Sequence, residues 1–407
     1  MAEPKSLGFD PIRLKAIDRH IAELYVGPGR LPGAILCVER RGQPAHLSIQ
    51  GLADREAKMP FALDSIVRIY SMTKPIVSIA FMMLFEEGRV QLDDPVARYI
   101  PEWSALGVYV SGEYPDFQTV APARPMQIID LLRHTSGLTY GFQFRTPVDA
   151  AYRALKIGEV VKSGTLESMV RDVARLPLEF SPGERWNYGI STDVVGYLIE
   201  KISGQRLDVF LQERILEPLG MSDTGFFVPP EKLSRLAACY FAPTGHDPQL
   251  FDSPTASSFA APPEFFSGGG GLVSTLADYL TFCRMLMKGG EWRGKRYISR
   301  SVLDLMTTSH LGGRRLTEMS VSRFSEAANP ANAGLGFGLG FSVNIEPARN
   351  MVPGSVGDYG WGGWASTSFW IDPKEELICI LLAQTGPSSA FNIRRELRTM
   401  IYSAMSD

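Results

Sequence analysis

The stretch that decides the architecture of this protein runs from Ser71 to Gly88, with the sequence SMTKPIVSIAFMMLFEEG. Apolar side chains recur in it at the spacing of an amphipathic helix, which predicts a helix with one buried face. The repeating residues are Ile76, Ile79, Ala80, Met83 and Leu84. Pro75 fits only the first turn of a helix, so the helix should begin near Ser71 or Met72. Gly88 is expected to end it.

The first four residues of this stretch form the pattern S-x-x-K, a candidate for nucleophilic chemistry. Residues three apart share one face of a helix, so the amine of Lys74 can reach the hydroxyl of Ser71. A serine at a helix N-terminus also meets backbone N–H groups and a dipole that favour developing negative charge. About one S-x-x-K is expected by chance in a chain of this length, so the spacing needs partners elsewhere.

The composition excludes several classes of protein. The chain has 407 residues, of which 45% are apolar and 21% charged, and its formal net charge of −3 gives no support for nucleic-acid or anionic-membrane binding. The N-terminus lacks the apolar core of a signal peptide, and no apolar run approaches about 18 residues. We therefore expect a cytoplasmic protein that binds neither nucleic acid nor membrane; the sequence leaves its oligomeric state unknown.

The cysteine pattern argues against a disulfide framework or a metal site. The four cysteines are widely spaced and include no C-x-x-C pair: Cys37, Cys239, Cys283 and Cys379. We expect them to be buried free thiols. The sequence also has no H-E-x-x-H motif or Cys/His cluster, so neither a metal nor any other cofactor is expected.

Strand patterns occur near both ends of the chain. After a first helix that Asp10 should cap, residues 33–38 and 45–51 read as two strands of a hairpin joined at Arg41 and Gly42. The first helix should bury Leu14, Ile17, Ile21 and Leu24 on one face. Near the C-terminus, strict alternation over residues 335–345 predicts one strand.

The last part of the chain adds a hairpin and a helix. Residues 365–371 and 377–383 read as its two strands, joined by a turn at Asp372 and Pro373. A final amphipathic helix should bury Ile393, Leu397, Met400 and Ile401.

The middle of the chain is helical. Amphipathic segments cover residues 127–133, 192–203 and 274–287, and Pro/Gly-rich loops separate them. Two long stretches, 109–124 and 242–267, show little periodicity and are expected to be loops that wall or cover a site. This arrangement predicts an α+β protein with a discontinuous sheet domain, residues 1–66 and 289–407, and a helical domain, residues 67–288.

A serine nucleophile needs a base, which the histidines do not supply. The elbow motif G-x-S-x-G is absent, and no histidine lies in a recognisable triad context. His134 follows a predicted helix and is interpreted as a structural cap. Tyr188 lies on a short loop between Gly183 and the next helix, while the glycines after Trp361 allow a ligand or backbone to approach closely.

Together these motifs resemble those of the serine β-lactamase and penicillin-binding protein superfamily, and within it the family VIII carboxylesterases, which are similar to class C β-lactamases. The three motifs are Ser71-Met72-Thr73-Lys74, Tyr188-Gly189-Ile190 and Trp361-Gly362-Gly363. The resemblance extends over nearly the whole chain. It includes Leu92-Asp93-Asp94-Pro95-Val96, Leu132-Arg133-His134-Thr135-Ser136-Gly137-Leu138 and Ser267-Gly268-Gly269-Gly270-Gly271-Leu272.

The resemblance implies a β-lactamase/DD-peptidase-like fold, in which terminal helices flank an antiparallel sheet and the active site lies in the cleft beside a helical domain. It implies that Ser71 is acylated, and that Lys74 and Tyr188 remove its proton. Backbone N–H groups of Ser71 and Trp364 would form the oxyanion hole. The base could be a phenolate favoured by protonated Lys74 or the neutral amine of Lys74, and their titrations would be coupled.

The departures from the superfamily pattern indicate the substrate. The resemblance makes Trp361, Gly362, Gly363 and Ile190 the substrate-binding residues, but lactamases typically carry Lys-Thr-Gly at the first three positions and Asn at the fourth. An indole in place of that lysine removes the partner of a substrate carboxylate and favours neutral acyl esters. We therefore expect a carboxylesterase acting on short- to medium-chain acyl esters. The alternatives are a β-lactamase, an acyltransferase or, less favoured, a non-catalytic binding protein.

Overall fold

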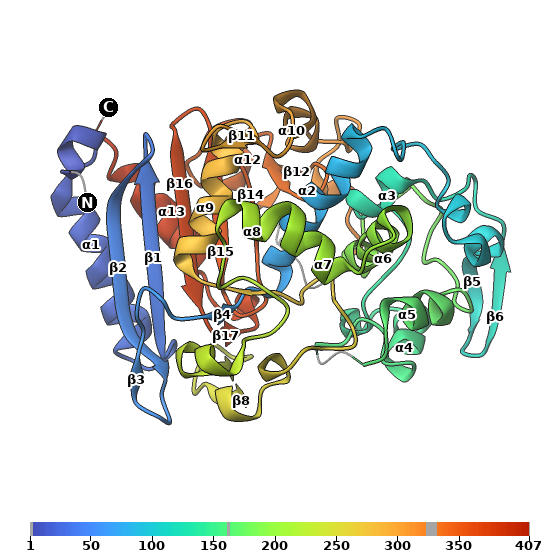
Figure 1. Cartoon of the computed structure of the whole chain (residues 1–407), viewed down its shortest axis with the longest axis horizontal. Helices are drawn as coiled ribbons and strands as arrows, with labels where there is room; N and C mark the ends of the chain where they lie inside the picture. The colour runs from blue at the N-terminus through green and yellow to red at the C-terminus, as the bar shows by residue number, and fades with distance from the viewer. Residues whose placement is uncertain (1–2, 161–162, 323–331, 407) are drawn as a thin grey trace.

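An eight-stranded antiparallel sheet dominates one side of the protein (Figure 1). The computed structural model describes residues 3–160, 163–322 and 332–406. The strands, in their order across the sheet, are β12 (Leu335–Phe337), β13 (Ser342–Asn344), β14 (Tyr359–Gly362), β15 (Ser368–Asp372), β16 (Leu377–Ala383), β1 (Gly33–Arg40), β2 (Gln43–Asp54) and β3 (Met59–Pro60). Because β1 pairs with β16, the two ends of the chain meet in the middle of the sheet.

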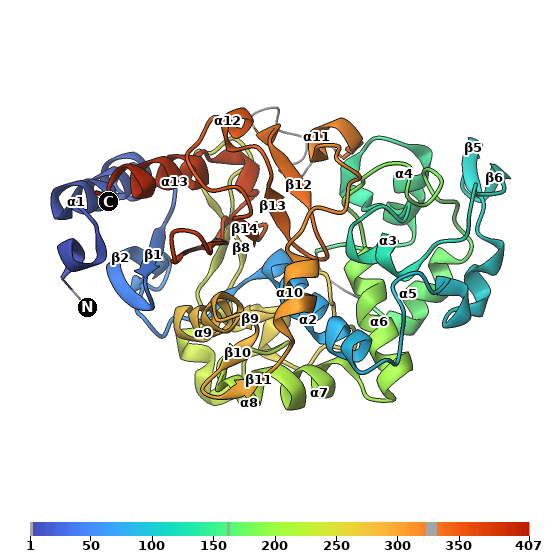
Figure 2. The ribbon, with the colours of Figure 1, turned by 90° about the horizontal axis from the view of Figure 1, so that it is seen from above.

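Both faces of this sheet are covered, as the alternation along its central strands requires. On one face, Leu36 and Leu381 pack with α1 (Pro11–Ile21) and α13 (Ile393–Ser403). On the other face, Ile35 and Ile380 join the larger core of the protein. Figure 2 shows α1 and α13 on one side of the sheet and α9 (Leu276–Met287) on the other. The predicted terminal helices flanking an antiparallel sheet are confirmed.

A mostly helical region lies beside the sheet (Figure 1). Its helices are α3 (Ile128–Leu132), α4 (Pro147–Ala154), α5 (Leu166–Val173), α6 (Ser191–Ser203), α7 (Leu207–Leu211) and α8 (Glu217–Leu219). Later helices are α10 (Arg300–Met306), α11 (Leu316–Met319) and α12 (Pro347–Asn350). Short strands complete the chain: β4 (Val67–Arg68), β5 (Val108–Glu113), β6 (Asp116–Val120), β7 (Cys239–Phe241), β8 (Gln249–Asp252), β9 (Val273–Ser274), β10 (Glu291–Trp292), β11 (Lys295–Arg296) and β17 (Thr385–Gly386).

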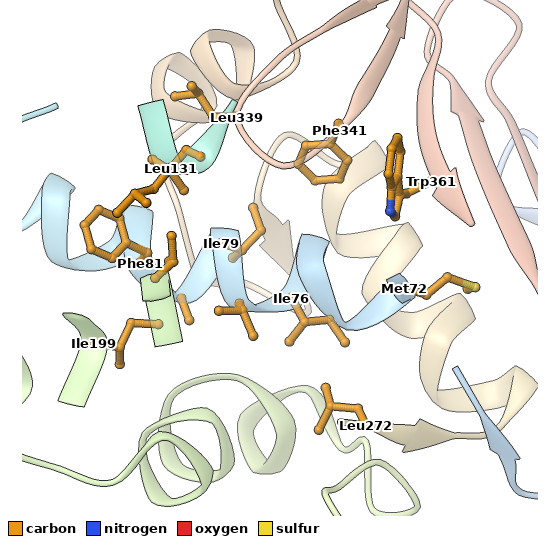
Figure 3. Close-up of a cluster of buried hydrophobic side chains, with 14 of the residues drawn as sticks. Met72, Ile76, Ile79, Phe81, Leu131, Ile199, Leu272, Leu339, Phe341 and Trp361 are labelled. Carbon is orange, nitrogen blue, oxygen red and sulfur yellow. The ribbon is translucent and has the colours of Figure 1, made fainter. Parts of the chain in front are cut away.

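The helix predicted from the opening stretch is α2 (Thr73–Glu86), which a 3-10 turn (Tyr70–Met72) precedes. Every residue from 73 to 84 is buried, so the helix is covered on all sides rather than on the one face that periodicity predicted. Figure 3 shows the reason: side chains from the sheet, from α6 and from the loop around Leu272 surround it. Gly88 lies just beyond its end, with a φ of +73°.

Several local predictions are confirmed. The side chain of Asp10 accepts a hydrogen bond from the Ile12 N–H at the start of α1. The turn between β1 and β2 falls at Arg41 and Gly42, which both have positive φ angles. All four cysteines are buried and unpaired.

Four local predictions were wrong, each for an identifiable reason. The predicted loop 242–267 contains strand β8, which pairs with β7 but is mostly exposed and so shows no hydrophobic alternation. Residues 335–345 form a hairpin rather than one strand, because Gly340 adopts a φ of +92° and turns the chain between β12 and β13. Part of the predicted loop 109–124 is the hairpin β5–β6, whose exposed faces leave no hydrophobic alternation to read. Leu24 is 47% exposed because α1 continues as a π-helical turn, which places Tyr25 in the core instead.

The predicted division into residues 67–288 and the remainder of the chain stays a prediction. Within residues 67–288, α9 packs on strand β16 of the sheet, so the sheet and the middle of the chain share one core. Over the described ranges, no helix combines the length and the apolar character that crossing a membrane demands.

Candidate active site

Three side chains that the sequence singled out meet at the start of α2. The Ser71 Oγ lies 3.2 Å from the Nζ of Lys74 and 2.6 Å from the hydroxyl oxygen of Tyr188. Lys74 and Tyr188 are 2% and 7% exposed, whereas Ser71 is half-buried. The serine hydroxyl is therefore the member of the group most open to a reactant, and both candidate bases are within hydrogen-bond reach of it.

Backbone geometry around Ser71 is unusual. Tyr70 adopts a φ of +43°, an uncommon conformation for a bulky side chain that is often associated with functional sites. This conformation lets the chain pass from β4, which ends at Arg68, into α2 within a few residues. Ser71 thus lies in the 3-10 turn just ahead of the α-helix, where backbone N–H groups are not yet used within the helix.

Lys74 is buried but has a complete set of acceptors. Its Nζ lies 2.6 Å from the carbonyl oxygen of Gly269, 3.2 Å from the hydroxyl of Tyr140, and 3.2 Å from Ser71 Oγ. It also lies 4.6 Å from the ring centroid of Tyr188. An ammonium group has three N–H donors, and these three oxygens match them. The amine is thereby fixed between the serine and the two tyrosines.

Tyr140 and Gly269 were not predicted as partners of Lys74. Gly269 lies in the glycine-rich segment that carried part of the family resemblance, but no residue pattern marks a backbone carbonyl as a ligand of a lysine. Tyr140 follows closely on the segment ending at Leu138, and its spacing to Lys74 is 66 residues. Only the folded backbone brings such residues together, so the sequence held no usable signal for either.

Asp193 holds the glycine-rich loop in place. It lies in the first turn of α6, is fully buried, and accepts hydrogen bonds from the Ser267 hydroxyl at 2.6 Å and the Gly269 N–H at 2.9 Å. A Cβ atom at position 269 would come within 2.5 Å of the other Asp193 oxygen, so only glycine fits there. The carboxylate therefore orients the carbonyl of Gly269 that Lys74 contacts.

The hydroxyl of Tyr140 is a neutral hydrogen-bonding group. Burial, followed by the nearby negative charge of Asp193, raises the pKa of Tyr140 well above its usual value. Tyr140 therefore keeps its proton at physiological pH and serves as a hydrogen-bond partner of Lys74.

His134 caps α3 through its backbone, as predicted: it has a left-handed φ of +58°, its N–H donates to the Leu131 carbonyl, and the next N–H, that of Thr135, donates to the Asp130 carbonyl. Its side chain plays no part in this cap.

The His134 side chain is buried within an aromatic cluster, with ring centroids 5.1 Å from Tyr188, 5.6 Å from Phe337 and 5.7 Å from Trp186. Its Nδ1 has no hydrogen-bond partner among the described residues. Burial, with a smaller contribution from Lys74, lowers the pKa of His134 well below its usual value, so the ring is a neutral packing group behind Tyr188.

The glycines after Trp361 allow a close backbone approach. A Cβ atom at Gly363 would lie 2.4 Å from the carbonyl oxygen of Ile69 and 2.2 Å from the side chain of Thr367. The end of β14 therefore packs directly against the segment that precedes Ser71. The ring of Trp364 contacts Tyr70, with centroids 5.4 Å apart, so the predicted oxyanion residue lies beside the segment that carries the serine.

Of the two other predicted substrate-binding residues, Trp361 lies beside Tyr188 and Ile190 does not face the site. The Trp361 ring lies 5.6 Å from that of Tyr188, and its indole N–H has no partner in the described part of the chain. Ile190 is fully buried at the start of α6, so its side chain is closed to a substrate in this structure. Trp361 adjoins Tyr188, one of the two candidate bases, whereas Ile190 packs in the core.

Comparison with known proteins places this architecture in a family. Residues 17–401 match the family model described as Beta-lactamase. The chain belongs to the Beta-lactamase family. It is 36% identical to Protein Rv1367c of Mycobacterium tuberculosis over 88% of this chain and 87% of that protein. It is 28% identical to Esterase EstB of Burkholderia gladioli, with 94% of each chain covered.

A solved structure supports the fold assignment. The structure of EstCE1, described as a hydrolase with promiscuous acyltransferase activity, has a TM-score of 0.78 and 25% sequence identity, with 99% of each chain covered. The family model and this structure confirm the predicted β-lactamase/DD-peptidase-like fold, and the relationship to family members named esterases makes the chain a serine hydrolase.

The burial of His134 predicts a pH dependence of stability. Because the pKa of His134 is lowered in the folded protein, the unfolded chain binds a proton on this ring more readily than the folded chain does. Burial of the neutral ring is therefore compatible with full stability above about pH 6.5, and stability is lost as the pH falls below that value. The free energy of unfolding should decrease below that pH by up to about 1.4 kcal/mol per pH unit for this group. Urea unfolding at pH 7.5, 6.5 and 5.5 measures the slope.

The matched variants are His134→Asn and His246→Asn. Asparagine tolerates the φ of +58° at position 134 and removes the titrating ring, so His134→Asn should reduce the slope. His246 is exposed in the folded protein, and its replacement should leave the slope as in the wild type. Equal slopes in wild type and His134→Asn would contradict the assignment.

Proposed function

We propose that this serine hydrolase is a cytoplasmic carboxylesterase that cleaves short- to medium-chain acyl esters through an acyl-Ser71 intermediate. The observation that carries the proposal is the half-buried Ser71 Oγ within 2.6 Å of Tyr188 and 3.2 Å of Lys74. The relationship to Esterase EstB over 94% of the chain supports an ester as the substrate, and the family VIII carboxylesterases are the group this combination fits best.

In the proposed acylation step, Tyr188 reacts as a phenolate and accepts the proton of Ser71 as Oγ attacks the carbonyl carbon of the ester. The shorter distance to Tyr188 favours this oxygen as the base, and Lys74 beside its ring favours negative charge on it. The oxyanion of the tetrahedral intermediate accepts hydrogen bonds from the N–H groups of Ser71 and Trp364. The intermediate collapses, the C–O bond to the alcohol breaks, and Tyr188 returns the proton to the departing alkoxide.

Deacylation repeats these steps with water in place of the serine. Tyr188 takes a proton from the water molecule as the water oxygen attacks the acyl carbonyl. The bond between the acyl carbon and Ser71 Oγ then breaks, Tyr188 returns the proton to Oγ, and the carboxylic acid leaves. Lys74, Tyr140 and Gly269 keep their contacts throughout, so the ammonium group supplies a fixed positive charge. The alternative base is the neutral amine of Lys74, which also lies within hydrogen-bond reach of Ser71 Oγ.

Two features support a neutral, apolar acyl ester. Trp361 stands beside Tyr188 where many β-lactamases have a lysine, so this position offers no cation to a substrate carboxylate. The half-buried Trp364 also continues into an apolar surface: its ring contacts Phe251 at 5.2 Å and stacks with Phe241 at 6.2 Å, and both phenylalanines are more than 40% exposed. We propose that this surface, Phe241, Phe251 and Trp364, contacts the apolar part of the substrate.

Acyl transfer is a second candidate activity. The acyl-enzyme of a serine esterase can react with an alcohol instead of water, and EstCE1 is described as a hydrolase with promiscuous acyltransferase activity. Hydrolysis remains the primary proposal because the esterase relative covers nearly the whole chain. A β-lactamase side activity is disfavoured by the missing cation at Trp361.

The first test is hydrolysis of p-nitrophenyl butyrate. Ser71→Ala should retain the fold and lose about 10⁴-fold or more of kcat/KM, because the nucleophile is absent. Tyr188→Phe should lose about 10²–10⁴-fold, because the base is absent. Nitrocefin should be hydrolysed much more slowly than the ester by wild type. Ester turnover that persists in Ser71→Ala would place the active site elsewhere.

The second test compares acyl-chain lengths. Each methylene that contacts an apolar surface contributes about 0.8 kcal/mol, so a double Phe241→Ser, Phe251→Ser variant should lose about 3- to 10-fold in kcat/KM for p-nitrophenyl octanoate. Turnover of the acetate ester should change by less than about twofold. Val110→Ser, on the distant hairpin β5–β6, is the control for loss of an exposed apolar side chain. Equal losses for octanoate and acetate would contradict a substrate contact.

A further inference from the structure

Arg394 holds the turn between β14 and β15. It lies in the first turn of α13, and its Nη2 donates hydrogen bonds to the carbonyl oxygens of Gly363 at 2.7 Å and Thr367 at 2.6 Å. The N–H of Gly363 also donates to the Thr367 carbonyl at 2.8 Å. The guanidinium group therefore fixes the turn from the side that faces α13.

Gly362 provides the space that this arrangement needs. A Cβ atom at position 362 would lie 2.6–2.7 Å from the carbon and nitrogen atoms of the Arg394 guanidinium. Any side chain at this position would have to displace the guanidinium group or the strand. The first glycine of the pair after Trp361 thus makes room for an arginine, while the second permits the close approach to Ile69.

The carbonyl of Gly363 and the N–H of Trp364 belong to one peptide group. This bond is not among the cis peptide bonds of the described chain, so its C=O and N–H point in opposite directions. A cation that donates to the carbonyl oxygen therefore fixes the direction of the N–H on the opposite side. A charge-assisted hydrogen bond to the oxygen also polarises the peptide and strengthens the N–H as a donor.

We propose that Arg394 is a positioning residue for the oxyanion hole: it orients and polarises the peptide group whose N–H, that of Trp364, binds the oxyanion. This inference rests on the proposed function of Ser71 as the acylated nucleophile. Arg394 acts through the peptide and does not touch the substrate. It therefore contributes where negative charge develops on the substrate oxygen, and little to binding of the neutral ester.

The neighbouring arginine provides a matched control. Arg395 lies on the same turn of α13 and donates to the side-chain oxygen of Asn332 at 3.0 Å and the carbonyl of Asn350 at 2.7 Å. It is partly buried like Arg394 and also ties α13 to backbone, but these two partners lie outside the β14–β15 turn. Its loss reports the general effect of removing an arginine from this helix.

The experiment measures ester turnover and inhibition by butylboronic acid in wild type, Arg394→Met, Arg394→Lys and Arg395→Met. The boronic acid adds to a reactive serine and forms a tetrahedral boronate, which presents one of its oxygens to the oxyanion hole. Arg394→Met should lower kcat and weaken boronic acid inhibition by about 10- to 100-fold. This loss is smaller than the loss expected from removing an oxyanion-hole donor, because the Trp364 N–H is still present. KM should stay within about twofold of the wild-type value. Arg394→Lys should recover part of both losses, and Arg395→Met should match wild type.

The possible outcomes separate the two proposals. If wild type neither turns over the ester nor binds the boronic acid through Ser71, the proposed function fails. If wild type does both and Arg394→Met retains wild-type kcat and inhibition, only the role of Arg394 is overturned. A change in KM and thermal stability alone, shared with Arg395→Met, also overturns it.

A second variant, Gly362→Ala, tests the proposal if Arg394→Met folds poorly. Gly362→Ala keeps the arginine but places a Cβ where the guanidinium lies, so it should reproduce the loss of kcat and of boronic acid inhibition. Wild-type kcat and inhibition in a folded Gly362→Ala protein, whose crystal structure shows the Arg394 guanidinium displaced from the Gly363 carbonyl, would overturn the proposal.

Discussion

The approach of the Gly363 backbone to the carbonyl of Ile69 is the constraint on which the site depends. Residues nearly 300 positions apart meet there, one at the end of a sheet strand and the other ahead of the buried helix α2. A Cβ atom at Gly363 would come within 2.4 Å of that carbonyl, so any other residue would push the strand away. Since Ser71 and Trp364 lie one or two residues beyond these contacts, their relative position is fixed by the packing of two backbones.

A buried lysine imposes the second constraint. Removing an ammonium group from water is costly unless hydrogen bonds replace its hydration, and a partly satisfied polar network destabilises a core. The acceptors around Lys74 meet this requirement, and Asp193 fixes the loop that supplies one of them. The glycine-rich loop, the first turn of α6 and the start of α2 are therefore coupled through a lysine. We infer that the same contacts that stabilise this core also keep the amine next to Ser71.

Local sequence patterns predicted the elements of this fold well where hydrophobic periodicity and turn residues agreed. The helix after Ser71, the hairpin at Arg41 and Gly42 and the terminal helices follow directly from such patterns. The prediction for residues 335–345 was wrong because the turn at Gly340 interrupts the strand without interrupting the alternation of apolar residues in the sequence. The hairpin β5–β6 shows no clear alternation, because most of its residues are exposed and only Tyr109 and Phe117 pack against the core.

For the site, the residue pattern predicted the members with a distinctive motif and missed those that act through tertiary contact. Ser71, Lys74 and Tyr188 were singled out and do lie together. Tyr140 and Asp193 were missed because nothing in their local sequence separates them from packing residues. The position of His134 after a helix correctly predicted a backbone cap, but no local pattern indicated that its side chain is enclosed by rings from segments far along the chain.

The placement of positive charge connects the substrate class to the catalytic geometry. Lys74 directs its N–H groups to Gly269, Tyr140 and Ser71, and Arg394 directs Nη2 to two backbone carbonyls. Both cations are thus engaged with groups of the protein, while the position next to Tyr188 that carries a lysine in many β-lactamases holds Trp361. A carboxylate on the substrate would lose its hydration there without gaining that partner, which costs free energy. A neutral ester carries no such penalty, and negative charge develops on it only at the carbonyl oxygen during reaction. We infer that this placement of cations disfavours binding of substrates that carry a carboxylate. Its electrostatic stabilisation acts instead on the oxyanion that forms in the transition state.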